Sequence, residues 1–486
     1  MPRWLIGPFS AEPLVWNSSF DSLCQLGWSR RYGGLIPEIA VLTRAVGEFA
    51  CVVTGRISPI LSVDHYGTIV LDRLHMPSPK VISLFSGAGG LDFGLEAAGF
   101  AFGAGVEMDA DCVETLLESR PDWPVVSRSI FEVPTQELLD LSVSKTGDVE
   151  LVAGGPPCQP FSKAGYWARG DALRLSDPRS NTLGAYLRVI REALPKVLLL
   201  ENVEGLTYAG KDEGLQLLLC ALEAINKREG TSYVPHVTVL NAASFGVPQL
   251  RERVFVVAHR DGRAFTFPQP THAPPDAERS LLDGDSEAYR TAWDALGDGE
   301  TSEDEDLAVR GKWADLLPSI PEGLNYLHHT DRGQGVPLFG WRRRYWTFLL
   351  KLAKNRPSWT IQAQPGPAVG PFHWSNRRLS VRELSRLQTF PNDVSIVGGR
   401  GSAQKQLGNA VPSLLAEVMG RTIREQLLDS PVGDLPLKLL PPRRTPVPPP
   451  EPVASVPARY RDLIGQHSPH PGTGLGHAAS RRAQFA

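Results

Sequence analysis

The chain has 486 residues, of which 42% are hydrophobic and 21% are charged. This composition is ordinary for folded domains, and the length suffices for two or three of them, so wholly disordered, collagenous and coiled-coil proteins are excluded. Lys and Arg number 50 against 53 Asp and Glu, a net charge of −3, so any surface that binds nucleic acid has to be local.

The five cysteines are spread through the chain and form no CxxC pair. Their spacing argues against a disulfide framework and a zinc site, and it indicates a reducing compartment. The first residues lack the apolar stretch of a signal peptide, and no run of about 18 apolar residues follows. We therefore expect a cytoplasmic protein that contacts no membrane and holds no metal.

Short apolar runs alternate with helical patterns from residue 80 onward. We expect strands at 81–85, 104–107, 149–153, 197–200, 237–240 and 254–258, and helices near 91–98, 112–117, 181–194 and 212–226. This alternation predicts an α/β fold with a parallel sheet, whose ligands bind at the carboxyl ends of the strands. Residues 1–79 show only two short strand candidates, at 50–53 and 67–71, and their role is open.

The alternation stops after residue 259, and the charge becomes segregated. Residues 276–306 contain twelve acidic residues and two arginines, whereas residues 332–378 contain nine cations and no acid, with tryptophans and a tyrosine between them. The basic stretch suits phosphate contacts, or else it packs against the acidic one. From residue 430 the chain is rich in proline, which is typical of an extended, flexible tail.

The first motif that carries chemistry is PPCQPFS at residues 156–162. It follows the expected strand at 149–153, so Cys158 lies on a loop at the carboxyl end of a strand. Prolines on both sides stiffen the loop, and a rigidly presented thiol suits a nucleophile. The alternative is a buried structural cysteine.

Two further motifs follow expected strands or lie within them. Glu201 comes directly after the strand at 197–200, where a carboxyl group can donate a proton, although it could also cap a helix. Gln249, Arg251 and Arg253 alternate along a short strand and would share a face as a row of donors, or form a solvated charged face.

The sequence FSGAGG at residues 85–90 lies between the first strand and the first helix. Its glycines allow a ligand to approach the backbone, and the helix N-terminus favours negative charge. Glu107 closes the second strand, where an acid can bind a ribose.

These motifs, in this order and spacing, resemble the DNA cytosine-5 methyltransferase family. The resemblance covers roughly residues 80–425 and includes two downstream motifs, RLSVREL with RLQTFP at 378–391 and QLGNAVP at 406–412. It implies a Rossmann-like S-adenosylmethionine-dependent methyltransferase sheet with a smaller inserted target-recognition domain. It also implies S-adenosyl-L-methionine as cofactor and double-stranded DNA as substrate.

Roles for individual residues follow from the resemblance. Cys158 would add to C6 of a flipped-out cytosine, Glu201 would bind N3, and the methyl group would then go to C5; Arg251 and Arg253 would hold the base. The resemblance implies two further groups, cofactor contacts and DNA contacts. The cofactor contacts are Phe85, Gly87, Gly90, Glu107, Ile130, Gly155, Leu183 and Asn409. The DNA contacts are Pro157, Gln159, Ser162, Asn202, Gln249, Arg342, Arg343 and Arg344.

The same resemblance implies an arrangement of domains. An N-terminal extension would span 1–79, a catalytic domain 80–262, a target-recognition domain 263–395, a return segment 396–429 and a Pro-rich tail 430–486. We expect a monomer that protects DNA in a restriction-modification system beside a cognate endonuclease. The alternatives are an RNA (tRNA) cytosine-5 methyltransferase, a catalytically inactive DNA-binding paralogue and, from the Gly-rich turn alone, a hydride-transfer enzyme.

Overall fold

The computed structural model describes residues 78–157, 182–207, 213–274, 286–299, 305–341 and 346–466, and the backbone of four strands before them. The chain divides into two units at Pro77 and Ser78. The strands of the first unit form an antiparallel meander in chain order: β1 (Ile39–Ala45), β2 (Glu48–Val53), β3 (Arg56–Val63) and β4 (Ile69–Leu71).

The second unit is built on a seven-stranded sheet of order β10-β12-β9-β8-β5-β6-β7. Its strands are β5 (Lys80–Leu84), β6 (Ala101–Glu107), β7 (Val125–Ser127), β8 (Leu151–Gly154), β9 (Val197–Val203), β10 (His236–Asn241) and β12 (Glu252–His259). The α/β fold is confirmed, but the sheet is only mostly parallel, because β12 runs antiparallel to both of its neighbours. Ten residues, 242–251, separate β10 from β12, too few for a parallel crossover of a dozen or more.

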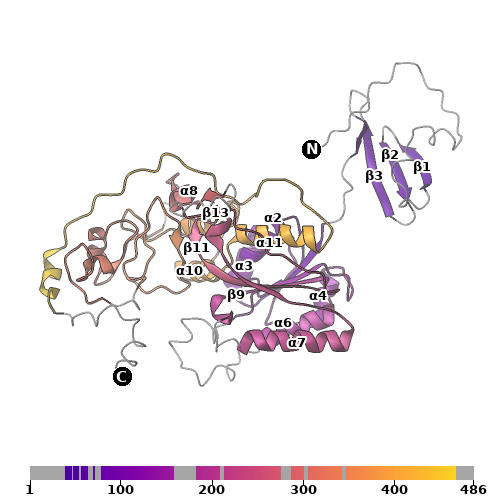
Figure 1. Cartoon of the computed structure of the whole chain (residues 1–486), viewed down its shortest axis with the longest axis horizontal. Helices are drawn as coiled ribbons and strands as arrows, with labels where there is room; N and C mark the ends of the chain where they lie inside the picture. Colours follow the sequence, from indigo (N-terminus) through magenta and orange to yellow (C-terminus); the bar gives the residue numbers. More distant parts are fainter. Residues whose placement is uncertain are drawn as a thin grey trace, which may run out of the picture. The chain divides into compact units, whose positions relative to one another are not determined.

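Helices cover both faces of the sheet (Figure 1). On one face lie α2 (Gly90–Ala97) and α11 (Ser413–Gln426), and on the other lie α4 (Thr135–Leu141), α6 (Thr182–Ala193) and α7 (Glu213–Glu229). Successive strand residues point to opposite faces of the sheet. Val81 therefore packs in the core beneath α2, and Ile82 packs in the core on the opposite face. A Cβ on Gly94 would lie 2.2 Å from the Ser413 carbonyl oxygen, so only glycine permits this approach of α2 and α11.

The segment between β12 and α11 contains mostly short elements. They are β13 (His272–Ala273), β14 (Glu287–Ala288), α8 (Ala292–Leu296), η6 (Ala314–Ser319), η7 (Tyr326–His329), β15 (Ser358–Trp359), α9 (Val381–Leu387) and α10 (Arg400–Asn409). β15 pairs with β11 (Gln249–Leu250), which lies just before β12. Two apolar cores hold the short elements. One joins α8, α9 and α10 to Phe93 of α2 and Leu116 of α3 (Ala110–Ser119), and the other surrounds η6 and η7.

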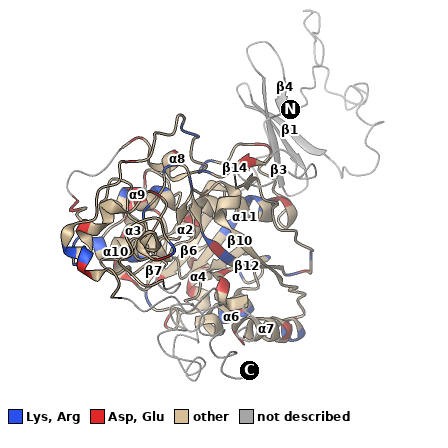
Figure 2. Cartoon of the chain, turned by 60° about the vertical axis from the view of Figure 1, so that its left-hand side comes forward, with Lys and Arg blue, Asp and Glu red and all other residues tan. Residues whose placement is uncertain are grey.

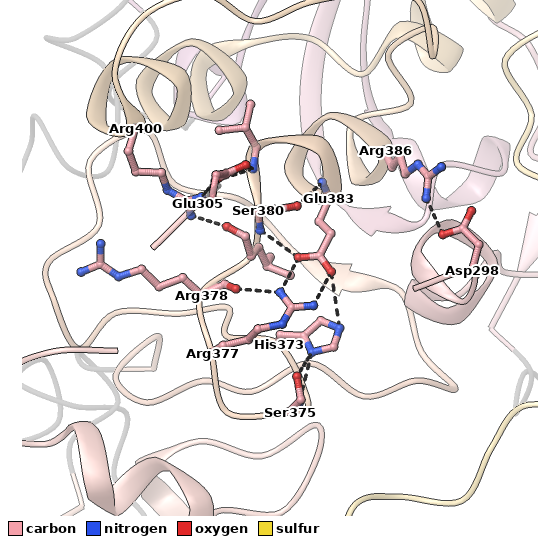
Figure 3. Close-up of polar contacts among 12 residues, drawn as sticks. Asp298, Glu305, His373, Ser375, Arg377, Arg378, Ser380, Glu383, Arg386 and Arg400 are labelled. Atoms are coloured by element: carbon pink, nitrogen blue, oxygen red, sulfur yellow. Dashed lines mark hydrogen bonds and ion pairs between the residues drawn. The ribbon is translucent and has the colours of Figure 1, made fainter. Parts of the chain in front are cut away.

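A polar cluster fixes the start of α9 (Figure 3). Ser380 and Glu383 form a capping box, the signature that SVRE at 380–383 carries in the sequence. The Glu383 carboxylate also accepts two 2.7 Å bonds from Arg377, and Glu305 accepts a 3.0 Å bond from the Val381 amide and 2.7 Å from Arg400. Two segments 76 residues apart are therefore joined at this helix.

The described part of the Pro-rich segment, residues 430–466, is largely extended and has specific partners. Arg443 and Arg444 bind the Asp294 carboxylate of α8, with Arg443 Nη1 3.1 Å from Asp294 Oδ2. The Tyr460 ring, in η9 (Ala458–Leu463), stacks on Trp313 at 5.6 Å, and its hydroxyl donates 2.6 Å to the Lys312 carbonyl oxygen. Composition alone predicts a flexible tail here, because a proline count carries no information about such distant partners.

Tyr460→Ala should destabilise the second apolar core by roughly 2–4 kcal/mol, because a buried aromatic side chain leaves a cavity. Thermal unfolding and limited proteolysis measure the change. The control is Leu435→Ala in the same segment, whose side chain is exposed. Equal stability of the two variants would show that residues 430–466 contribute nothing to this core.

Candidate active site

The carboxyl ends of β5, β8 and β9 meet at one edge of the sheet, because these strands are parallel neighbours. The loop toward Cys158 leaves β8 there, and Glu201 lies near the end of β9. A Cβ on Gly155 would lie 3.0 Å from Glu201 Oε2. Gly155 therefore lets the carboxylate sit directly beside the start of the cysteine loop.

Glu201 and Arg253 form a buried ion pair, with Arg253 Nε 2.9 Å from Glu201 Oε1. Burial raises the pKa of Glu201, and the positive charges of Arg253 and Arg251 offset part of that shift. The protonated carboxyl is thereby favoured relative to an exposed glutamate. Such a group can give a proton or a hydrogen bond to a substrate.

Two side chains hold the backbone that leads into Cys158. Asn202 Nδ2 donates to the Pro156 carbonyl oxygen at 3.1 Å, and Thr182 Oγ1 donates to that of Pro157 at 3.2 Å. Pro157 itself is exposed. Cys158, Gln159 and Ser162 lie outside the described residues, so their predicted roles stay predictions. Thr182 was not among the predicted site residues, since a threonine at a helix start gives no functional signal.

Gln249 and Arg251 point into the protein. Gln249 is fully buried; its amide oxygen accepts from Ile361 N at 3.0 Å and its amide nitrogen donates to Gln388 Oε1 at 2.9 Å. Arg251 is 1% exposed and donates to the carbonyl oxygens of Ile361, Gly408 and Ala410 at 3.3, 2.8 and 2.8 Å. The expected row of donors is thus split: Arg253 pairs with the Glu201 carboxylate, while the buried side chains of Gln249 and Arg251 bind other parts of the chain.

A second group of residues surrounds the Gly-rich loop. Glu107 Oε2 accepts from Gly87 N at 2.7 Å, and its other oxygen accepts from the amides of Met108 and Asp109 at 2.7 and 2.8 Å. A Cβ on Gly90 would lie 2.3 Å from the Val411 carbonyl oxygen. The loop, the end of β6 and the QLGNAVP segment are therefore adjacent.

This arrangement fits a nucleoside cofactor with a charged tail. Glu107 offers a carboxylate for ribose hydroxyls, and the loop offers backbone amides with Phe85 and Gly87 at φ of 59° and 54°. Asn409 is exposed at the end of α10, Leu183 is half-buried and Ile130 is buried. Met108, 71% exposed directly after Glu107, adds an apolar surface beside it; we did not predict it, because an isolated methionine gives no signal.

The acidic residues of the 276–306 region that are described pair with arginines outside the basic stretch. Asp294 and Asp298 bind Arg443 and Arg444 of the C-terminal segment, and Asp298 also binds Arg386. Figure 2 shows Lys and Arg interspersed with Asp and Glu over the described elements. The acidic segment therefore does not neutralise the cations at 332–378 through any described ion pair.

The cations of the basic stretch fall into two groups. Lys354 bonds to Glu322 and Glu451 at 2.7 and 2.9 Å, Lys351 is buried, and Arg377 binds Glu383. These three side chains are therefore buried or paired with acidic residues within the folded chain. Arg332 and Arg356 are exposed and Arg378 is partly exposed, and the Arg378 guanidinium points away from the cluster in Figure 3. Arg342, Arg343 and Arg344 lie outside the described residues.

Other kinds of site are not indicated in the part of the chain that the structure describes. No three His, Cys, Asp or Glu side chains gather as metal ligands there. No helix within the same residues has the length and apolarity needed to cross a bilayer.

Comparison with known proteins gives consistent matches. Residues 79–425 match the family model for C-5 cytosine-specific DNA methylase. The type II methyltransferase M.SacI of Streptomyces achromogenes is 41% identical over 374 residues, covering 72% of this chain and 94% of that protein. The type II methyltransferase M1.HphI of Haemophilus parahaemolyticus is 33% identical, covering 72% and 88%. A crystal structure of a prophage-encoded DNA modification methyltransferase (E. coli) has a TM-score of 0.51 at 18% identity, covering 73% and 100%, and supports the fold.

Asp92, in the first turn of α2 beneath the Gly-rich loop, gives a pH-dependent prediction. Neither of its buried oxygens has a hydrogen-bond partner of good geometry. Burial raises its pKa from 3.8 to about 7, and the Ser83 and Ser86 hydroxyls offset only part of the shift. At a pH between 3.8 and about 7, Asp92 keeps its proton in the native state and has lost it in the unfolded state. Asp92 therefore lowers the free energy of unfolding as the pH rises through this range.

Asp92→Asn should remove that decline. We expect the variant to match the wild type in urea unfolding near pH 4 and to exceed it by up to about 4 kcal/mol at pH 8, taking 1.36 kcal/mol per pKa unit. A constant difference between the two proteins across this pH range would contradict the assignment.

Proposed function

Since the chain belongs to the family of C-5 cytosine-specific DNA methylases, we propose that Cys158, Glu201 and Arg253 form its catalytic group. The chain is a DNA cytosine-5 methyltransferase, and its methyl donor is S-adenosylmethionine. The assignment of residues is supported above all by the Glu201–Arg253 ion pair, which lies at the start of the loop that carries Cys158.

The chemistry explains why both a thiol and an acid are needed. C5 of cytosine is a poor nucleophile until a group adds to C6, and Cys158 as thiolate is that group. Addition places negative charge on the ring, and protonated Glu201 stabilises it by donating to N3. C5 then takes the methyl group that bound S-adenosylmethionine would supply, and loss of the C5 proton with elimination of the Cys158 thiolate restores the aromatic ring. Arg253 fixes the orientation of the Glu201 carboxyl through the ion pair.

The target carbon cannot be reached inside a duplex, so the cytosine has to rotate out of the helix at a cost of a few kcal/mol. Pro156 and Pro157, with their carbonyl groups held by Asn202 and Thr182, fix where the cysteine loop begins. A loop whose start is fixed in this way can present the thiol to a base that arrives from the duplex.

We assign the binding of the cofactor to the residues around the Gly-rich loop. Phe85, Gly87, Gly90, Glu107 and Asn409 would hold the cofactor, with Met108, Ile130, Leu183 and Gly155 completing the pocket. When bound, S-adenosylmethionine supplies an electrophilic methyl group. Lys405 Nζ binds Asp109 Oδ2 at 2.6 Å, and this ion pair ties α10 to the segment after Glu107 on the rim of this pocket.

We further propose a sequence-specific role in restriction-modification, because the relatives named above are type II methyltransferases. Arg356 and Arg378, together with Arg342, Arg343 and Arg344, would contact double-stranded DNA, whose phosphates attract guanidinium groups. A monomeric state, a cytoplasmic location and a cognate endonuclease belong to the same proposal.

Bisulfite sequencing of plasmid DNA from cells that express the chain tests the proposal. We expect methylated cytosines in one short sequence context with the wild type and none with Cys158→Ser, while the affinity of the purified variant for S-adenosylmethionine stays within about threefold. The serine hydroxyl is a far weaker nucleophile than a thiolate. Methylation of RNA alone, or full activity of Cys158→Ser, would refute it.

Glu201→Gln should lower the rate of methyl transfer by about 100- to 10,000-fold, the usual contribution of a positioned acid. The wild-type single-turnover rate should fall as pH rises through the pKa of Glu201, since only the protonated carboxyl donates, and the residual rate of the variant should lack this alkaline limb. Glu252→Gln, an exposed neighbour, is the control. An unchanged pH profile in Glu201→Gln would exclude Glu201 as the acid.

A further inference from the structure

Two exposed tryptophans touch each other in the segment between β12 and α11. The rings of Trp346 and Trp359 lie 5.4 Å apart in an edge-to-face arrangement, and the two residues are 41% and 37% exposed. Neither belongs to the apolar cores formed by the described residues around them. Packing within the fold therefore does not account for this aromatic pair, and neighbouring large exposed side chains commonly mark a contact surface.

The register of β11 and β15 places the pair near the catalytic edge. Trp359 lies opposite Leu250, and Thr360 Oγ1 donates to the Leu250 carbonyl oxygen at 2.7 Å. Ser358 is fully buried, so its neighbour Trp359 faces the surface. Leu250 precedes Arg253 by three residues, which spans about 10 Å of extended chain. Neighbouring strands lie about 5 Å apart, so the backbone of Trp359 lies within about 15 Å of that of the arginine that pairs with Glu201.

Trp346 is held in place from a different part of the chain. The buried side chain of Asn325 donates to the Trp346 carbonyl oxygen at 2.6 Å. Two separate anchors, at Asn325 and along β11, therefore fix one aromatic surface. In the sequence three consecutive arginines, at 342–344, come shortly before Trp346. Arginines close in sequence to an exposed tryptophan suit a nucleic acid, whose phosphates attract cations and whose bases stack on aromatic rings.

We propose that Trp346 and Trp359 contact the DNA bases next to the extrahelical cytosine and offset part of the cost of flipping it. This inference rests on the proposed function. When the cytosine leaves the helix, its neighbours lose a stacking partner, and an aromatic side chain provides a new apolar face for them. The two tryptophans then position the DNA and contribute to specificity. They take no part in the methyl transfer itself.

The first test compares Trp346→Ala and Trp359→Ala with the control Leu217→Ala, an exposed apolar residue on α7. The substrate is duplex DNA with the target sequence found by bisulfite sequencing. We expect kcat/KM for DNA to fall about 10- to 100-fold in the tryptophan variants, which corresponds to the stacking of a single base. The affinity for S-adenosylmethionine and the melting temperature should match those of the control.

Two conservative variants separate stacking from apolar filling. Trp359→Phe keeps an aromatic face and should recover activity to within about threefold of the wild type. Trp359→Leu fills the same space without such a face and should stay impaired, which also covers the case in which the alanine variant folds poorly. Equal activity of the Phe and Leu variants would overturn the proposal.

The decisive comparison uses DNA in which the target cytosine is mispaired. A mispaired base costs less to flip, so the loss caused by the alanine variants should shrink to under about threefold. Normal activity of these variants on paired DNA, or an equal loss on both substrates, would overturn the inference and leave the proposed function intact. A wild type that methylates no DNA would instead refute the proposed function.

Discussion

The buried guanidinium of Arg251 is the interaction on which the rest of the arrangement depends. Arg251 lies just before β12. Its guanidinium donates to the carbonyl oxygen of residue 361, next to β15, and to those of residues 408 and 410, at the end of α10. Burial lowers its pKa, and the charge of Arg253 adds to that effect. Without the side chain, three buried carbonyl groups would lose their partner, at about 1–3 kcal/mol each. The seven-stranded sheet, the segment around β15 and the QLGNAVP segment are thereby held as one unit.

This constraint separates two arginines that are only two residues apart. Arg251 joins distant segments, whereas Arg253 reaches the Glu201 carboxylate near the carboxyl edge of the sheet. The same anchoring positions β15 beside β11, and so brings an exposed tryptophan toward the proposed catalytic pair, Glu201 and Arg253. The cofactor loop depends on the return of the chain as well, because Gly90 contacts Val411 and α2 packs directly against α11. The proposed catalytic group, cofactor site and DNA surface thus share a single framework.

Much of this framework could be predicted from the sequence, because strand alternation and short motifs are local signals. The strands around 149–153 and 197–200, and with them the place of Glu201, follow from apolar runs alone. What local patterns miss is long-range pairing: the direction of β12, the burial of Gln249 and the partners of residues 430–466. Asp92 shows the same limit, since its burial beneath the Gly-rich loop is a property of the packed helix. Nothing in its sequence neighbours indicates a carboxyl group with a pKa near 7.

The measurement that tests the central claim most directly is covalent capture at Cys158. Duplex DNA carrying 5-fluorocytosine at the target position is incubated with the protein and S-adenosylmethionine, and the mixture is resolved under denaturing conditions. Fluorine at C5 cannot leave as the proton does, so the account predicts that the wild type stays bonded to the DNA through Cys158, while Cys158→Ser releases it. Peptide mapping should locate the bond in residues 156–162. A wild type that methylates ordinary DNA but forms no such bond, or a bond at another residue, would contradict the account.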